Sequence, residues 1–264
     1  MRLFTRNIME EKIKVSAIIN TKNNEEKLCE TLESIKDFDE IIVIDEHSTD
    51  DTIEIAKEYK AKIIYADKNN LALAQNQALN ESKNDWIFIV KQNEIIPQKL
   101  IFEISNYILN PKKNKLCCSF FQKKYYLNKE IKSALSKNNL RLFKKDYAEF
   151  KNDYSFDLKI KQGKIHKIKP NSKAKNAYIL KFIEPNIVKN ISEILDNARN
   201  LYKEADKITA SIILKPALVF LNWYFIKKGF LDGRRGFILA KQKYIESFIL
   251  QTMILEGNNK NDLW

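Results

Sequence analysis

Residues 41–52 read Ile41-Ile42-Val43-Ile44-Asp45-Glu46-His47-Ser48-Thr49-Asp50-Asp51-Thr52. The four aliphatic residues at the start are typical of a short strand buried on both faces of a parallel sheet. We expect Ser48 or Thr49 to cap the helix that follows, with Asp50 and Asp51 in its first turn, where the helix dipole favours negative charge. Open α/β sheets bind ligands at the carboxyl ends of their strands. Asp45 is therefore a candidate to accept hydrogen bonds from a ribose or a uracil-type ring.

Short apolar runs and amphipathic segments alternate around this stretch. The apolar runs predict strands at residues 15–19, 41–44, 61–65 and 86–90. Apolar residues spaced three or four apart predict helices at 25–35, 49–59, 71–79 and 97–109. This order indicates an α/β fold with a doubly wound, mostly parallel sheet.

The pattern changes after about residue 110. We expect one or two strands in 116–127, a short strand at 140–143 and a hairpin in 155–169 around Gln162-Gly163. Helices are expected at 187–207, 208–228 and 234–255. The sequence thus predicts one sheet domain over 1–184, with halves at 12–110 and 111–184, and a helical C-terminal region over 185–264.

The charge of the chain is unevenly distributed. Residues 1–100 carry 14 Lys and Arg against 19 Asp and Glu, a net of −5, so the remainder holds 46−14 = 32 basic and 34−19 = 15 acidic residues, a net of +17. Such a basic surface suits nucleic acid, an anionic membrane or a phosphorylated substrate, but a solvated lysine-rich face is the explanation that we favour for most of these lysines. No RNA- or DNA-binding motif is present, so we expect no nucleic-acid partner.

Cysteine and histidine are scarce, with three and two residues. They do not make a disulfide framework or a zinc site, and we expect Cys117-Cys118 to be small buried residues. The N-terminus lacks the apolar core of a signal peptide, and no apolar run approaches the ~20 residues that span a bilayer, so a cytoplasmic location is expected. His47 is either a general base or, as we favour, a surface imidazole paired with a carboxylate.

Several segments, in order along the chain, resemble family 2 glycosyltransferases. They are Thr21-Lys22-Asn23-Asn24-Glu25-Glu26, Ile44-Asp45 with Ser48-Thr49-Asp50, Ala61-Lys62, Asn76 with Ala78-Leu79, and Asp85-Trp86-Ile87. The branch that adds sugars to the lipopolysaccharide core is similar in two further segments, Arg141-Leu142-Phe143-Lys144-Lys145 and Gly229-Phe230-Leu231-Asp232-Gly233-Arg234-Arg235-Gly236-Phe237. The resemblance implies a GT-A fold and an inverting transfer of a sugar to a lipopolysaccharide, lipooligosaccharide or other surface glycan.

The resemblance also implies a binding site for a UDP- or ADP-sugar donor. Residues expected to bind the nucleotide are Thr21, Asn24, Glu25, Asp45 and Asn76, and Arg141 is expected on the acceptor side. A helix cap with its first-turn carboxylate is an equally good explanation of Asn24 and Glu25. The acceptor implied is a lipid-linked or surface glycan.

The segment Lys91-Gln92-Asn93-Glu94 stands where the family usually has Asp-x-Asp-Glu, whose aspartates hold a divalent cation against the donor diphosphate. Hard cations need carboxylate oxygens, and Lys91 would repel a cation. Only Asn93 and Glu94 remain as remnants of a metal site, so the sequence does not support bound Mg²⁺ or Mn²⁺. Three interpretations stay open: Lys91 faces the diphosphate as a point charge, the protein has lost catalysis and serves as a binding or scaffold partner, or Lys91 is a solvated lysine.

An inverting transferase needs a group that takes the proton of the acceptor hydroxyl. The related branch places a histidine and a glutamate near the acceptor, and the matching positions here are Phe156 and Asp157. Asp157 and Glu94 are therefore the candidate catalytic residues. Gln75 replaces the basic residue that usually precedes Asn76.

The C-terminal region contains an aromatic and apolar stretch, residues 216–226, followed by Lys227-Lys228. Aromatic residues beside Lys and Arg are typical of helices that lie in a membrane interface with their cations toward anionic headgroups. Ordinary helix-on-helix packing explains the same stretch. The first interpretation predicts a peripheral protein on the cytoplasmic face of the inner membrane.

Overall fold

The structure is a computed structural model that describes residues 12–67, 70–111, 116–131, 139–151, 158–161, 165–168, 178–183 and 214–261. The chain divides into two compact units, residues 1–123 with 136–181 and residues 124–135 with 182–264. The sequence placed a domain boundary at 184–185, whereas this division adds residues 124–135 to the C-terminal unit. The domain limits stay a prediction, and each unit is described by itself below.

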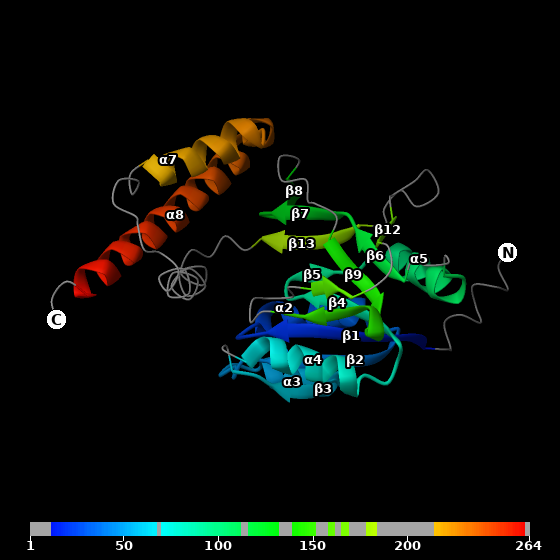
Figure 1. Cartoon of the computed structure of the whole chain (residues 1–264). Helices are drawn as coiled ribbons and strands as arrows, with labels where there is room; N and C mark the ends of the chain where they lie inside the picture. The colour runs from blue at the N-terminus through cyan, green and yellow to red at the C-terminus, as the bar shows by residue number, and fades with distance from the viewer. Residues whose placement is uncertain are drawn as a thin grey trace. The chain divides into compact units, whose positions relative to one another are not determined.

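A seven-stranded sheet forms the centre of the first unit (Figure 1). Four strands run parallel, in the order β4 (Trp86–Lys91), β1 (Ile13–Thr21), β2 (Phe38–Asp45) and β3 (Lys62–Tyr65). Beside β4 lies β9 (Asn139–Lys144), which is antiparallel to β4 and also to β6 (Cys117–Phe120), and β12 (Ile165–Ile168) runs parallel to β6. Among these seven strands β9 alone is reversed, so the predicted mostly parallel α/β sheet is confirmed.

Alternating side chains of the parallel strands form two apolar layers. On one face, Val15 and Ile19 of β1 pack in a core with α2 (Glu25–Ser34) and α5 (Gln98–Leu109). On the other face, Ile18 and Ile42 pack in a core with α4 (Leu71–Glu81). Full burial of each such side chain contributes about 1.5–3 kcal/mol, so two fully covered faces fix the strands and hence the positions of their carboxyl ends.

Helix α3 (Thr52–Glu58) begins later than the sequence indicated. The prediction that Ser48 or Thr49 caps it is wrong, as is the placement of Asp50 and Asp51 in its first turn, because Asp51 is the N-cap residue and its side chain makes no capping bond. The Thr52 N–H donates to Oδ1 of Asp50 at 3.2 Å. The hydroxyl of Ser48 donates to Asp45 instead, since that carboxylate ends the neighbouring strand.

The hairpin predicted for residues 155–169 is also wrong. Strand β11 (Leu158–Ile160) pairs antiparallel with β10 (Ala148–Phe150), whereas β12 joins the large sheet, with Ile165 opposite Cys117. The two strands therefore have different partners. A place beside the buried strand β6 offers a full hydrogen-bonding ladder and an apolar face, which local glycine-turn chemistry does not outweigh.

Four short strands form another sheet, in the order β5, β13, β7 and β8. Strand β5 (Glu94–Ile95) pairs antiparallel with β13 (Ile179–Ile183), which places Lys181 opposite Glu94. Strands β7 (Gln122–Tyr126) and β8 (Lys129–Glu130) pair antiparallel, with Tyr126 opposite Lys129. The predicted strand region 116–127 is thus two strands, β6 and β7.

Two helices of the second unit lie side by side, α7 (Leu214–Leu221) and α8 (Gly233–Asn261). A π-helical turn (Asn222–Ile226) and a 3₁₀ turn (Gly229–Asp232) join them. A Cβ atom at Gly236 would lie 1.8 Å from the carbonyl oxygen of Gly229, so only glycine permits this close crossing. The predicted helix 187–207 and the start of 208–228 lie outside the described residues. Within the described residues, no helix combines the length and the apolar character needed to cross a bilayer.

Candidate functional site

The carboxyl ends of β1, β2 and β4 meet at one edge of the large sheet. Thr21 lies opposite Asp45 in the β1–β2 pair, and Asn20 lies opposite Lys91 in the β1–β4 pair. Neighbouring strands are about 4.8 Å apart, so the backbones at Asp45 and Lys91, two strands from one another, are separated by about 10 Å. The residues that the sequence assigned to a nucleoside and to a diphosphate therefore lie at one edge.

Asp45 is fully buried and organises the loop after β2. Its Oδ2 accepts the backbone N–H of Ser48 at 2.8 Å, and its Oδ1 accepts the Ser48 hydroxyl at 2.5 Å. The Glu46 N–H donates to the carbonyl of Thr21 at 3.0 Å and so continues the β1–β2 ladder by one step. The carboxylate is held in one position at the end of its strand.

The loops after β1 and β2 are cross-linked by side chains that bind backbone N–H groups. Asn23 Oδ1 accepts the N–H of Thr49 at 2.9 Å, and Asp50 Oδ2 accepts the N–H of Glu25 at 3.1 Å. In return, Glu25 Oε2 accepts the N–H of Asp51 at 3.0 Å. Burial alone would raise the pKa of Asp50, but the hydrogen bonds from Thr52 and from the Glu25 N–H outweigh it and hold that pKa below its ordinary value.

Several buried polar side chains have no hydrogen-bond partner among the described residues. At or just after the end of β1 these are the hydroxyl of Thr21 and the complete amide groups of Asn20 and Asn24, and on α4 it is the amide group of Gln75. Asn24 is the N-cap residue of α2 and Glu25 lies in its first turn, as the helix-cap explanation predicted, but the Asn24 side chain makes no capping bond. Buried polar groups in proteins are nearly always paired. These groups are therefore candidates to bind a ligand.

The sequence reasoning chose Thr21 and Asn24 but did not select Asn20 or Gln75 as site residues. Each carried a signal: Asn20 directly follows a buried apolar run, and Gln75 lies on the face of α4 that also contains Ala74, Ala78 and Leu79. A polar residue at a position where the strand or helix periodicity calls for an apolar one indicates a buried polar side chain.

The end of β4 is built around a second buried carboxylate, Glu94. Its Oε1 accepts hydrogen bonds from Arg141 Nη2 at 2.8 Å and from Gln122 Nε2 at 2.6 Å, and its Oε2 accepts the Lys91 N–H at 2.9 Å. Arg141 is 2% exposed. The Nε and Nη1 groups of Arg141 have no hydrogen-bond partner among the described residues.

The family model described as "Glycosyl transferase family 2" matches residues 16–161. The chain belongs to glycosyl transferase family 2. The prediction of a family 2 glycosyltransferase is confirmed, and the parallel-rich sheet with its covering helices is that of a GT-A fold.

Relatives with similar sequences include an uncharacterized glycosyltransferase of Rickettsia typhi, 27% identical over 89% of this chain and 82% of that protein. The poly(ribitol-phosphate) β-N-acetylglucosaminyltransferase TarP of Staphylococcus aureus is 32% identical over 36% of this chain and 32% of its own. The structure of S. aureus TarS 1–349 in complex with UDP is 14% identical over 92% of both chains, with a TM-score of 0.48.

The residues of this glycosyltransferase do not fit a divalent cation at the end of β4. Within the described residues, no three His, Cys, Asp or Glu side chains gather as metal ligands. Both oxygens of Glu94 accept protein hydrogen bonds, and Lys91 and Asn93 occupy the positions where the family resemblance implies aspartates. A cation there would lack its preferred anionic oxygens.

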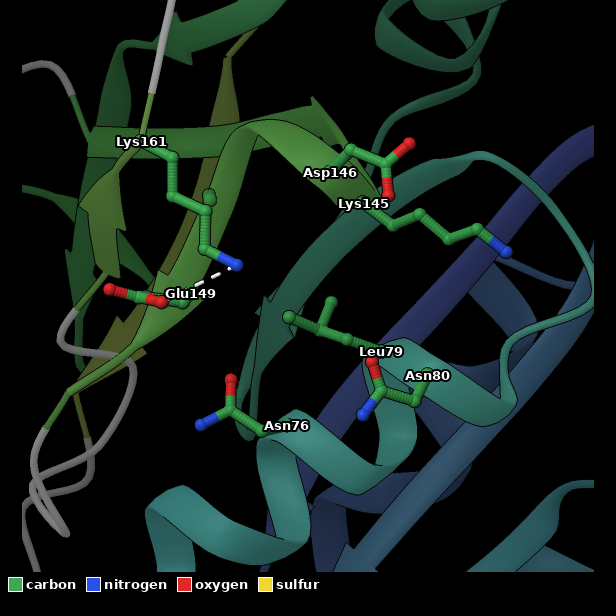
Figure 2. Close-up of a pocket in the computed structure, with 8 residues that line it drawn as sticks. Asn76, Leu79, Asn80, Lys145, Asp146, Glu149 and Lys161 are labelled. Atoms are coloured by element: carbon green, nitrogen blue, oxygen red, sulfur yellow. Dashed lines mark ion pairs between the residues drawn. The ribbon is translucent and has the colours of Figure 1, made fainter.

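Asn76, the remaining predicted nucleotide ligand, lies elsewhere in the glycosyltransferase. Its Nδ2 donates to the Phe150 carbonyl at 2.9 Å, and its Oδ1 accepts the Phe150 N–H at 3.0 Å. It lines a cavity of about 240 Å³ beside the Lys161–Glu149 ion pair of 3.3 Å (Figure 2). Lys145, also in the lining, donates its N–H to the carbonyl of Asp85, just before β4 begins. Both polar atoms of the Asn76 side chain bond the backbone of Phe150, and its role in nucleotide binding stays a prediction.

Four further residues were singled out from the sequence. His47 is exposed and pairs with Asp67 Oδ1 at 3.0 Å, which confirms the surface-imidazole interpretation. Cys117 and Cys118 are buried as expected, and burial raises the pKa of their thiols to about 11 and about 12. Asp157, the first candidate catalytic residue, lies outside the described residues.

Proposed function

We propose that this glycosyltransferase moves a sugar from a UDP- or ADP-sugar donor to a lipopolysaccharide-type or other surface glycan, with inversion at the anomeric carbon. The observation that supports it best is the strand register, which aligns Thr21 with Asp45 and Asn20 with Lys91. A nucleoside at the end of β2 and its diphosphate toward the end of β4 would span that edge of about 10 Å.

The residues at the ends of β1 and β2 have the chemistry to bind a nucleoside. Asp45 is an acceptor for a ring N–H or a ribose hydroxyl, and the buried amides of Asn20 and Asn24 offer both donors and acceptors. Glu25 supports this pocket indirectly, because its carboxylate holds the Asp51 N–H of the neighbouring loop. We assign nucleoside binding to Thr21, Asn20, Asn24 and Asp45.

An inverting transfer proceeds by a single displacement. The acceptor oxygen bonds to the anomeric carbon while the bond from that carbon to the β-phosphate oxygen breaks, and its electron pair leaves on the nucleoside diphosphate. The proton of the acceptor hydroxyl passes to a base. Because both oxygens of Glu94 already accept hydrogen bonds, we assign the base to Asp157.

Calorimetry with UDP, ADP and uridine tests the donor site. We expect one of the two diphosphates to bind, and Thr21→Val to weaken it, with Thr31→Val in α2 as the matched control for an equally buried threonine. A folded protein that binds neither UDP nor ADP contradicts the proposal.

The acceptor class is tested in a deletion strain by mass spectrometry of its surface glycan. TarP, the relative similar over 36% of this chain, is named for a poly(ribitol-phosphate) substrate. We expect one sugar to be missing from the glycan in the deletion strain and to return with the wild-type gene. Full restoration by an Asp157→Asn variant contradicts the assigned base.

Association with the inner membrane surface is the second part of the proposal. The apolar side chains exposed on α7, α8 and the turns between them include Leu218, Leu221, Phe225, Ile226, Phe230 and Leu231. Lys215, Lys228 and Arg234 are exposed on the same segment. Apolar and cationic side chains together suit an anionic bilayer surface.

Vesicle co-sedimentation tests this surface. We expect the protein to bind vesicles with anionic lipid, to bind less at high salt, and to lose binding in Phe225→Glu with Ile226→Glu. Phe102→Glu on α5, also an exposed phenylalanine, is the control and should leave binding unchanged. Equal binding to neutral vesicles contradicts the proposal.

A non-catalytic role as a binding or scaffold partner in glycan assembly is the alternative. Lys91, Asn93 and the fully engaged Glu94 favour it, because they remove the acidic metal ligands that the family resemblance implies. An assay with nucleotide-sugar and acceptor extracts tests this alternative. Nucleotide binding together with no transfer of sugar and no release of nucleoside diphosphate would favour it.

A further inference from the structure

We infer that the end of β4 is an anion site where Lys91 and Arg141 bind the donor diphosphate in place of a divalent cation. The inference rests on the proposed function and deepens it, because it states how the diphosphate of the nucleotide-sugar is neutralised.

Glu94 connects the guanidinium of Arg141 to the backbone of Lys91. One carboxylate oxygen accepts the backbone N–H of Lys91 at 2.9 Å, and the other accepts Arg141 Nη2 at 2.8 Å. The bond from Arg141 brings together two residues that are 47 positions apart in sequence. Glu94 is therefore the anchor of the cluster, and its charge is balanced by the guanidinium instead of by a metal.

Arg141 keeps donors that the described residues do not use. Its Nε and Nη1 groups are buried and have no hydrogen-bond partner there, although a guanidinium carries five N–H donors in a fixed plane. The planar arrangement of these donors matches the geometry of phosphate oxygens better than the donors of any other cationic side chain do. A buried arginine with unused donors is the independent observation that indicates an anionic ligand.

Lys91 adds the second positive charge at the carboxyl end of β4. It is the last residue of the strand and lies opposite Asn20, whose amide also lacks a partner among the described residues. With Lys91 and Arg141 positive and Glu94 negative, the cluster carries one net positive charge. Such a fixed charge stabilises the leaving diphosphate as negative charge develops on it.

The turn after Lys91 supports the same conclusion. Asn93 has a φ of +64°, in the left-handed region that asparagine tolerates, and its Oδ1 is buried without a partner among the described residues. The turn thus returns the chain so that Glu94 reaches back to the Lys91 N–H. One neutral amide oxygen does not replace the carboxylates that a divalent cation requires.

Calorimetry of the full chain with UDP, uridine and inorganic pyrophosphate, each with EDTA and with Mn²⁺, tests the inference. We expect UDP and pyrophosphate to bind equally well in both conditions. Lys91→Met should weaken UDP and pyrophosphate at least about tenfold while uridine binding stays unchanged, and Lys91→Arg should restore most of the affinity. Lys99→Met, at an exposed lysine of α5, is the control and should have no effect.

The outcomes separate the inference from the proposed function. UDP binding that requires Mn²⁺, or that ignores Lys91→Met, overturns the inference and leaves the donor site intact. Pyrophosphate binding that depends on Lys91 supports the anion site even if uridine fails to bind. Absence of binding by UDP, ADP and pyrophosphate in every condition overturns both.

Discussion

The two ends of the proposed donor site are built on opposite electrostatic principles. At the ends of β1 and β2, carboxylates accept backbone N–H groups: Asp45 binds Ser48, and Asp50 binds Glu25. At the end of β4, the carboxylate of Glu94 is paired with a buried arginine. The first end leaves neutral amides without partners, and the second leaves guanidinium donors. The comparison shows how one sheet edge suits a neutral nucleoside at one end and an anion at the other.

Removal of the Glu94 charge should have the largest effect. We expect Glu94→Gln to destabilise the fold by about 3–5 kcal/mol, because it leaves Arg141 as an unpaired charge in a buried site. Urea denaturation followed by circular dichroism measures it. Glu30→Gln is the control, since its exposed pair with Lys27 contributes about 0–1 kcal/mol. Equal effects in the two variants would show that the pair is not a buried one.

Restoring the family's aspartates should turn the end of β4 from a metal-free anion site into a metal-binding one. We expect Lys91→Asp with Asn93→Asp to make UDP binding depend on Mn²⁺, with at least about tenfold tighter binding when the metal is present, because carboxylates supply its oxygen ligands. Calorimetry with and without EDTA measures the change. An unchanged response to metal would contradict the placement of this segment beside the diphosphate.

Ligand binding at the ends of β1 and β2 should respond to a change that leaves binding at the end of β4 unaffected. We expect Asp45→Asn to weaken uridine and UDP by a similar factor of about ten, because a charged hydrogen-bond acceptor is lost. Lys91→Met, in contrast, should weaken UDP and pyrophosphate and leave uridine binding unchanged. If Asp45→Asn weakens pyrophosphate as much as uridine, the two ends are not independent.

The smallest expected effect concerns pH. The pKa of Asp50 is lowered from its ordinary value of 3.8, so its hydrogen bonds stabilise the folded state above that pH and are lost as pH falls through the lower folded-state pKa. Because Asp50 is only half-buried and solvent screens its charge, we expect Asp50→Asn to cost only a few tenths of a kcal/mol at neutral pH. Denaturation at pH 7 and below pH 3 should show the difference between variant and wild type disappear in acid. A difference that persists in acid would show that the charge is not its cause.

The sequence anticipated the first end of the site more fully than the second. Asp45 directly follows an apolar run, and Thr21 and Asn24 lie in the polar stretch after another; the residues at the ends of parallel strands share an edge. Arg141, which was expected on the acceptor side, lies against Glu94 because β9 enters the sheet between β4 and β6, and its acceptor role stays a prediction. Such an insertion depends on contacts far apart in sequence, which local periodicity does not report.

The failed hairpin at 155–169 has the same cause. Its alternating residues and Gln162-Gly163 satisfied the local rules, yet β11 and β12 pair with β10 and β6. Likewise, Ser48 was a good capping residue by sequence, but a neighbouring carboxylate binds its hydroxyl. Local propensities are worth tenths of a kcal/mol, whereas a place in a buried sheet is worth several, so tertiary pairing prevails.

By itself, the sequence determined the alternation of strands and helices, the two apolar faces of the sheet and the polar residues that end its strands. These follow from the spacing of apolar side chains, which every segment carries locally. Only the tertiary structure decided that Glu94 is neutralised by Arg141, that Asn20 and Gln75 are buried without partners among the described residues, and that β9 runs against its neighbours. Burial and charge pairing depend on which distant segments meet, and that is set by the free energy of the whole fold.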